Sequence, residues 1–193
     1  MDETTFLVTL LDPNAVSGAS ITPATFDSGG STYDNDWAGS AEAVLGASYA
    51  TLVATPNIID IRNMTKNRAM RYDLSSGDLI IVFESGQTTD YPTIDWSVRD
   101  EVHTMTINAR TLQDERGASD ANFARDRLAN LYKVIRHRLE LNRKGVTVTL
   151  TGGDSRKINQ LFLGSRTESN DRNKRLFGYK LTVEMKKFAV AIP

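Results

Sequence analysis

The sequence predicts an α+β protein: a mostly antiparallel sheet of about four to five strands packed against a long amphipathic helix, plus a second, shorter helix. Two observations lead to this prediction. Residues 119–142 carry apolar side chains at helical spacing, and the strand-like segments after them are separated by loops. Strands joined by short loops pair in antiparallel fashion, because parallel strands need a long crossover connection.

The long helix is predicted over residues 119–142. Ser119 or Asp120 can cap its first turn with a side-chain oxygen, and Gly145 is expected to end it. Basic side chains gather near its end, where cations complement the helix dipole. The apolar stripe consists of Phe123, Leu128, Leu131, Tyr132, Ile135 and Leu139.

The chain of 193 residues is long enough for one sizeable core and short for two domains. Residues 1–39 are predicted to form a loose N-terminal arm, because residues 13–39 are rich in Ser, Gly, Thr, Asp and Asn. Within it, residues 4–11 form a short apolar segment, either strand or helix. Trp37 is read as an apolar anchor at the end of the arm. Residues 40–193 are expected to form a single domain.

The elements of that domain follow from local patterns. Residues 40–54 predict the shorter helix, and the residue before Pro56 ends it. Polar loops are expected over residues 85–93 and 164–175, and a bulge is expected near His103. Strands are predicted over residues 58–61, 79–84, 96–110, 146–150, 157–163 and 177–185.

Charge is unevenly distributed along the chain. Residues 1–100 hold 5 Lys and Arg against 14 Asp and Glu, a net charge of −9, whereas residues 101–193 hold 18 against 10, a net charge of +8. The two halves can attract each other within one fold, or they can provide complementary surfaces between neighbouring copies. Both interpretations remain open at this point.

The composition argues against several kinds of functional site. Cysteine is absent and only two histidines occur, which argues against thiolate chemistry and against a zinc site built from histidines. No export signal and no membrane-spanning run is seen, so we expect a soluble protein kept inside a cell or in a particle assembled there. No cofactor is predicted.

One weak pattern is typical of metal-dependent nucleases. Glu184 and Lys186 are two residues apart on a predicted strand and therefore point to the same face, where both could meet one phosphate. An upstream acid such as Asp171 or Asp154 would complete a Mg²⁺ site. A solvated strand face has the same composition, so the nuclease is a distant alternative.

A second candidate is His103, which lies near Asp100 and Glu101 and could act as a general base. No suitable Ser or Cys nucleophile accompanies it, and a histidine in a strand is more often a hydrogen-bonded packing residue.

The segment 164–175 is basic, with Arg166, Arg172, Lys174 and Arg175, but Glu168 and Asp171 dilute its charge. It also lacks an aromatic platform for bases. We therefore expect an interface hairpin, and no specific recognition of nucleic acid.

Several strings, taken with the order of elements, resemble the tail terminator proteins of long-tailed bacterial and archaeal viruses. They are Thr55-Pro56-x-Ile58, the run from Gly77 to Glu84, the strand end from Thr106 to Thr111 leading into the long helix, and a closing strand from Phe177 to Lys187. The resemblance covers roughly residues 37–190.

The resemblance implies a virion structural protein without an active site, located in the tail–neck region and assembled in the host cytoplasm. Six copies would form a ring that ends tail-tube polymerisation and joins the tail to the head. Its partners would be its own copies, the tail tube protein and a head-completion or neck protein. Another viral neck, connector or minor tail protein is the nearest alternative. The residues expected at interfaces are Arg166, Arg172, Lys174, Arg175, Arg136 and Trp37.

Overall fold

The computed structural model describes residues 1–12, 16, 18–23, 37–46, 58–63, 78–92, 98–112, 121–170 and 176–191. Its helices are α1 (Glu3–Leu11), α2 (Trp37–Leu45) and α3 (Ala121–Leu141). Its strands are β1 (Ser20–Pro23), β2 (Ile58–Asn63), β3 (Asp78–Asp90), β4 (Val98–Leu112), β5 (Val146–Thr149), β6 (Ser155–Ile158), β7 (Gln160–Glu168) and β8 (Leu176–Ala191).

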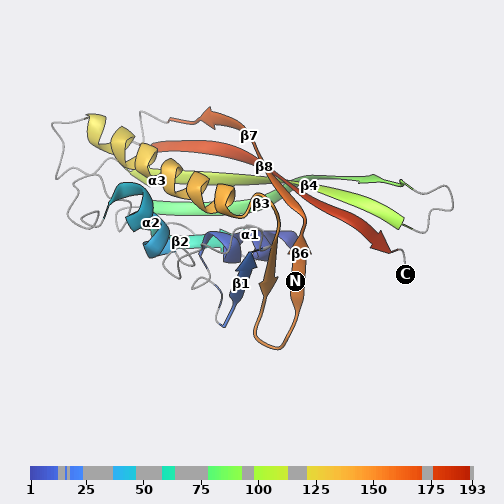
Figure 1. Ribbon diagram of the computed structural model, residues 1–193. Helices are drawn as coiled ribbons and strands as arrows, with labels where there is room; N and C mark the ends of the chain where they lie inside the picture. The colour runs from blue at the N-terminus through green and yellow to red at the C-terminus, as the bar shows by residue number, and fades with distance from the viewer. Residues whose placement is uncertain are drawn as a thin grey trace.

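The strands form two sheets. The larger has the order β2-β3-β4-β8-β7 and is antiparallel except for the parallel pair β2–β3. The smaller has the order β1-β5-β6 and is antiparallel throughout. Helix α3 lies along the larger sheet, with α2 beside it, and the smaller sheet extends from the same body (Figure 1). The α+β class with mostly antiparallel pairing is therefore confirmed, whereas the prediction of one sheet is wrong.

The N-terminal segment is part of the core. Every residue of α1 is buried, and Phe6, Leu7 and Leu10 are fully enclosed. Asp2 caps the helix, because its side chain accepts a hydrogen bond from the Thr5 amide at 2.6 Å. A helix that is apolar on all sides must be buried on all sides. The prediction of a loose arm over residues 1–39 is therefore wrong for residues 3–11, and β1 adds a paired strand; residues 24–36 lie outside the described part.

Helix α3 buries Leu128, Leu131, Ile135 and Leu139 of the predicted stripe, and Tyr132 is partly buried against them. Val134 is buried as well, although the prediction did not include it, and the side chain of Phe123 lies outside the described part. The helix ends at Leu141, and Gly145 has a φ of 114°, a conformation that suits glycine. Ser119 and Asp120 lie outside the described residues. Helix α2 begins three residues before the predicted start, and Gly46, with a φ of 92°, follows its end.

The central strands are longer than predicted. β3 continues to Asp90, so the expected loop at 85–93 is wrong, and β7 continues to Glu168, so the expected loop at 164–175 is wrong in its first part. These segments are polar and exposed, and they lack the apolar alternation that marks a half-buried strand. Two irregularities flank His103, near which the bulge was predicted: the β4–β8 register shifts at Asp100, three residues before His103, and Ser85 is an extra residue of β3 opposite the step from Thr104 to Met105.

The ends of β3, β4 and β8 project together beyond the helices (Figure 1). We call this projection the β-extension and define it as residues 86–90, 98–102 and 187–191.

Candidate functional site

The face of the larger sheet that packs against the helices changes from apolar to charged at the base of the β-extension. Side chains alternate along a strand, so every second residue of β4 and β8 shares this face. Beyond its apolar part, the same face continues into His103 and Glu101 on β4 and into Lys187 on β8. The apolar part consists of Met105, Ile107, Ala109, Leu181, Val183 and Met185, all buried.

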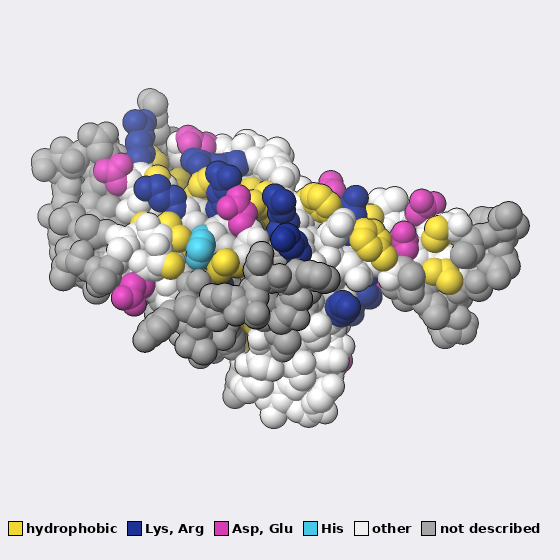
Figure 2. Space-filling model, viewed as in Figure 1, with side chains coloured by type: hydrophobic (Ala, Val, Ile, Leu, Met, Phe, Trp, Pro, Cys, Tyr) yellow, Lys and Arg dark blue, Asp and Glu magenta, His cyan; other side chains and the backbone are white. Residues whose placement is uncertain are grey.

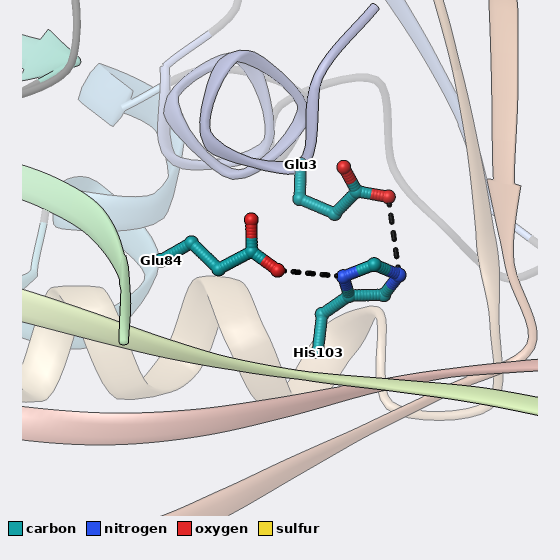
Figure 3. A group of neighbouring side chains, drawn as sticks. All are labelled: Glu3, Glu84 and His103. Atoms are coloured by element: carbon teal, nitrogen blue, oxygen red, sulfur yellow. Dashed lines mark hydrogen bonds and ion pairs between the residues drawn. The ribbon is translucent and has the colours of Figure 1, made fainter. Parts of the chain in front are cut away.

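His103 is the centre of this charged region, with 4% of its surface exposed. Its Nδ1 lies 2.8 Å from Glu84 Oε1, and its Nε2 lies 3.3 Å from Glu3 Oε1 (Figure 3). Glu101 Oε2 lies 3.5 Å from Nε2 as well. The two carboxylates drawn in Figure 3 approach opposite nitrogens of the ring, Glu84 from β3 and Glu3 from α1. One histidine thus joins α1, β3 and β4.

Three cations surround these carboxylates. Lys187 Nζ lies 3.2 Å from Glu101 Oε2, and an Arg99 nitrogen lies 2.9 Å from Glu101 Oε1. Burial raises the pKa of Glu101, but Lys187, His103 and Arg99 outweigh this effect and hold its pKa below the ordinary value. Arg156 of β6 forms an ion pair with Glu3 and also donates to the carbonyl oxygen of Met1 at 2.5 Å. The smaller sheet therefore holds the start of α1 in place.

His103 Nε2 is buried beside carboxylate oxygens of Glu3 and Glu101 without a hydrogen bond of ordinary geometry, and Glu3 Oε1 is paired with Arg156. One potential ligand atom from each of Glu3, Glu84 and His103 lies within 4.8 Å of the other two. Imidazole nitrogen and carboxylate oxygen are ligands of divalent transition metals. Such an arrangement can hold a metal ion, or it can store charge in a buried network.

Two members of this cluster, His103 and Glu101, are candidates from the sequence, and the structure brings them together. Glu3 and Glu84 were not predicted. Glu84 had a usable signal, because it follows the apolar run of β3 with the same alternation as the buried Ile80 and Val82. Glu3 had none, because its approach to His103 depends on how α1 packs.

Two residues of the nuclease alternative, Glu184 and Lys186, lie in the described part of the chain. Glu184 is exposed, and in strand register it lies on the opposite face of the sheet from His103. The Lys186 amine lies over the ring of Phe162, 4.9 Å from its centre. In the part of the chain that the structure describes, Glu184 belongs to no group of three potential metal ligands. Asp171 lies outside that part.

Arg166, one of the residues expected at an interface, packs against two aromatic rings. Its guanidinium lies 4.5 Å from the centre of the Tyr132 ring and 5.3 Å from that of Tyr179, and it forms an ion pair with Glu168 at 3.0 Å. The two rings meet edge to face, 5.4 Å apart. Burial raises the pKa of Tyr179, so this phenol remains neutral.

Of the other residues expected at an interface, Arg136 and Trp37 lie in the described part of the chain. Arg136 pairs with Glu140 one turn along α3 at 2.7 Å, which raises the pKa of Arg136. Trp37 is half-buried and packs against the core, as expected of an anchor. Arg172, Lys174 and Arg175 lie outside the described residues.

Part of the charge asymmetry acts within the fold. Two acids of the first half pair with bases of the second half: Glu3 with Arg156, and the buried Asp78 with Arg127 at 2.9 Å. Other basic side chains gather over α3 in Figure 2. At its C-terminal end lies a pocket of about 470 Å³, lined by Arg143, Lys144, Asn159, Gln160 and Phe162. Part of the charge asymmetry is therefore neutralised by ion pairs within the fold, and part of it remains as a basic surface.

No protein-family model matches the chain, and no curated protein matches it in sequence. Among the described residues, none of the helices has the length and apolar character needed to cross a membrane.

Proposed function

We propose that the chain is a tail terminator, a virion structural protein whose copies form a ring that ends tail-tube growth and joins the tail to the head. The observation that carries this proposal is the β-extension, because parts of its two outer strand edges have no strand beside them among the described residues. The resemblance in sequence to tail terminator proteins is the reason for proposing a ring at the end of the tail tube.

The open edges follow from the strand register. β2 pairs with β3 only as far as Val82, so in the described part of the chain the outer edge of β3 has no strand beside it up to Asp90. β7 pairs with β8 as far as Lys186, and the Phe188 amide donates to Asn159 Oδ1 at 3.0 Å; beyond Phe188, no strand lies beside the outer edge of β8 in the described part of the chain. An open edge presents backbone donors and acceptors to any strand that approaches it.

The surface of this region has two further features of an interface. Tyr91, just after β3, and Phe188 of β8 expose 40% and 43% of their surface. Asp90 and Asp100 lie directly opposite each other between β3 and β4, whereas Lys and Arg side chains gather over α3 (Figure 2). Opposite charges on separate surfaces favour head-to-tail contacts between copies, the type of contact that closes a ring.

Light scattering over a concentration series, followed by negative-stain electron microscopy of the largest species, tests the proposal. We expect rings of six copies of the 21.4 kDa chain. A chain that stays monomeric alone and also fails to bind tail tubes would overturn the proposal. Mg²⁺-dependent cleavage of DNA that is lost in Glu184→Gln would instead support the nuclease.

A further inference from the structure

We infer that the end of the β-extension of one copy docks into the pocket at the C-terminal end of α3 on the next copy. At the end of the β-extension lie Asp90, Tyr91 and Asp100, which we call the acidic tip. The pocket of about 470 Å³, which we call the basic pocket, is lined by Arg143, Lys144, Asn159, Gln160 and Phe162. The inference rests on the proposed ring, and it names the two surfaces that meet at each contact between copies.

The basic pocket carries positive charge that the fold leaves available. Arg143 and Lys144 lie in the turn after α3, and both side chains are exposed. Among the residues that the structure describes, no acid forms an ion pair with the Arg143 guanidinium, whereas Arg136 on α3 pairs with Glu140. A guanidinium presents several N–H donors in a planar fork that matches a carboxylate. The pocket therefore suits an acidic side chain from another molecule.

The acidic tip carries the opposite charge. Asp90 and Asp100 are direct partners in the register of β3 and β4, and like charges at directly opposite positions destabilise a strand pair. Asp90 Oδ1 accepts a hydrogen bond from the Tyr91 amide at 2.9 Å, and no Lys or Arg of the described residues pairs with Asp90. A cation supplied by another copy would therefore offset the repulsion within the tip.

Each surface also exposes an aromatic ring beside its charges. Tyr91 directly follows Asp90, and Phe162, which lines the basic pocket, exposes 41% of its surface. Aromatic rings favour offset-stacked or edge-to-face contacts with each other, and tyrosine is common at protein interfaces. Clefts of about 300–1,000 Å³ hold a drug-sized molecule, so the basic pocket has room for the side chains of Asp90 and Tyr91.

The acidic tip points away from the basic pocket of its own chain. β3 and β4 run into the β-extension away from α3, whereas the pocket lies where α3 ends and β7 begins (Figure 1). The contact therefore joins two copies, and each copy uses its tip on one neighbour and its pocket on the other. Such a head-to-tail contact generates a ring when the rotation between copies closes.

Charge reversal tests the inference. Asp90→Lys and Arg143→Glu each place like charges together at every contact, so each should raise the concentration at which half of the chains assemble at least about tenfold in light scattering. The combined variant Asp90→Lys/Arg143→Glu has opposite charges again and should recover most of the assembly. Asp126→Lys and Lys157→Glu are the matched controls, because they reverse exposed charges on α3 and β6 outside both surfaces.

Cross-linking reports the contact directly, because the chain has no cysteine of its own. Thr89→Cys/Gln160→Cys places one thiol beside each surface and keeps both charges and both rings. A short bismaleimide linker should join this variant into a ladder of products that ends at six copies. Thr89→Cys/Ser155→Cys, with its second thiol on an exposed position of the smaller sheet, is the control and should give far less of the ladder. Circular dichroism must show that all variants are folded.

Three results would overturn the inference and leave the proposed ring intact. They are rings of Asp90→Lys or Arg143→Glu as abundant as those of the controls, a combined variant that recovers no assembly, and equal cross-linking of the two cysteine pairs. A wild-type chain that never self-associates would also overturn the inference, whereas the proposed function would then fail only if the chain did not bind tail tubes either.

Discussion

Arg138 of α3 donates two hydrogen bonds to the carbonyl oxygen of Leu10, at 2.6 Å from one terminal nitrogen and 3.2 Å from Nε. Its other terminal nitrogen donates to Ser40 Oγ of α2 at 3.2 Å, and its side chain is fully buried. Leu10 lies in the last turn of α1, where carbonyl groups have no partner within the helix. One side chain thus caps α1 and joins the three helices.

Replacing Arg138 with Met should lower the free energy of unfolding by about 2–4 kcal/mol, because a buried carbonyl and a buried hydroxyl would lose their donor. Urea denaturation measures this change. Arg136→Met, on the exposed face of the same helix, is the matched control and should cause no measurable change. Equal effects of the two substitutions would show that the buried contacts contribute little.

Leu7→Ala should destabilise the protein by about 2–5 kcal/mol, because it removes a fully buried side chain from α1. Leu141→Ala, at a position with 47% of its surface exposed, is the control and should have a small effect. Thermal unfolding compares the two. A tolerant Leu7 would mean that residues 3–11 are a loose arm after all.

Arg166→Gln should destabilise the protein by about 0.5–1 kcal/mol, because the guanidinium over Tyr132 and Tyr179 would be lost. Glu168→Gln, which removes only the exposed ion pair, is the control and should change stability less. Denaturation measures stability, and light scattering measures assembly. Loss of assembly without loss of stability would assign Arg166 to an interface instead of to the fold.

Thr88→Lys should weaken ring formation and leave the monomer folded. Thr88 is exposed in the β-extension, and lysine on an open strand edge discourages pairing with another chain. Ser155→Lys adds the same charge to an exposed strand of the smaller sheet and is the control. Light scattering and electron microscopy compare the two variants. Rings of Thr88→Lys as abundant as those of Ser155→Lys would exclude the β-extension from the interface.

Local patterns were sufficient where one face of an element is buried and the other is exposed. Helix α3 and the alternating part of β8 were predicted from the sequence for this reason, and so was the α+β class. Local patterns failed where both faces have the same character. Helix α1 is buried all round, and the outer half of β3 is polar on both faces, so neither shows a period.

The sequence by itself determined the class, the long helix and the candidacy of His103 with Glu101. Only the tertiary structure decided that Glu3 and Glu84 join them, because that meeting needs α1 to pack against β3 and needs β3 to pair with β4 in the register that sets Glu84 opposite Met105, two residues from His103. Periodicity records which face of an element is buried. Contacts between distant elements depend on the packing of the whole core, which no local pattern contains.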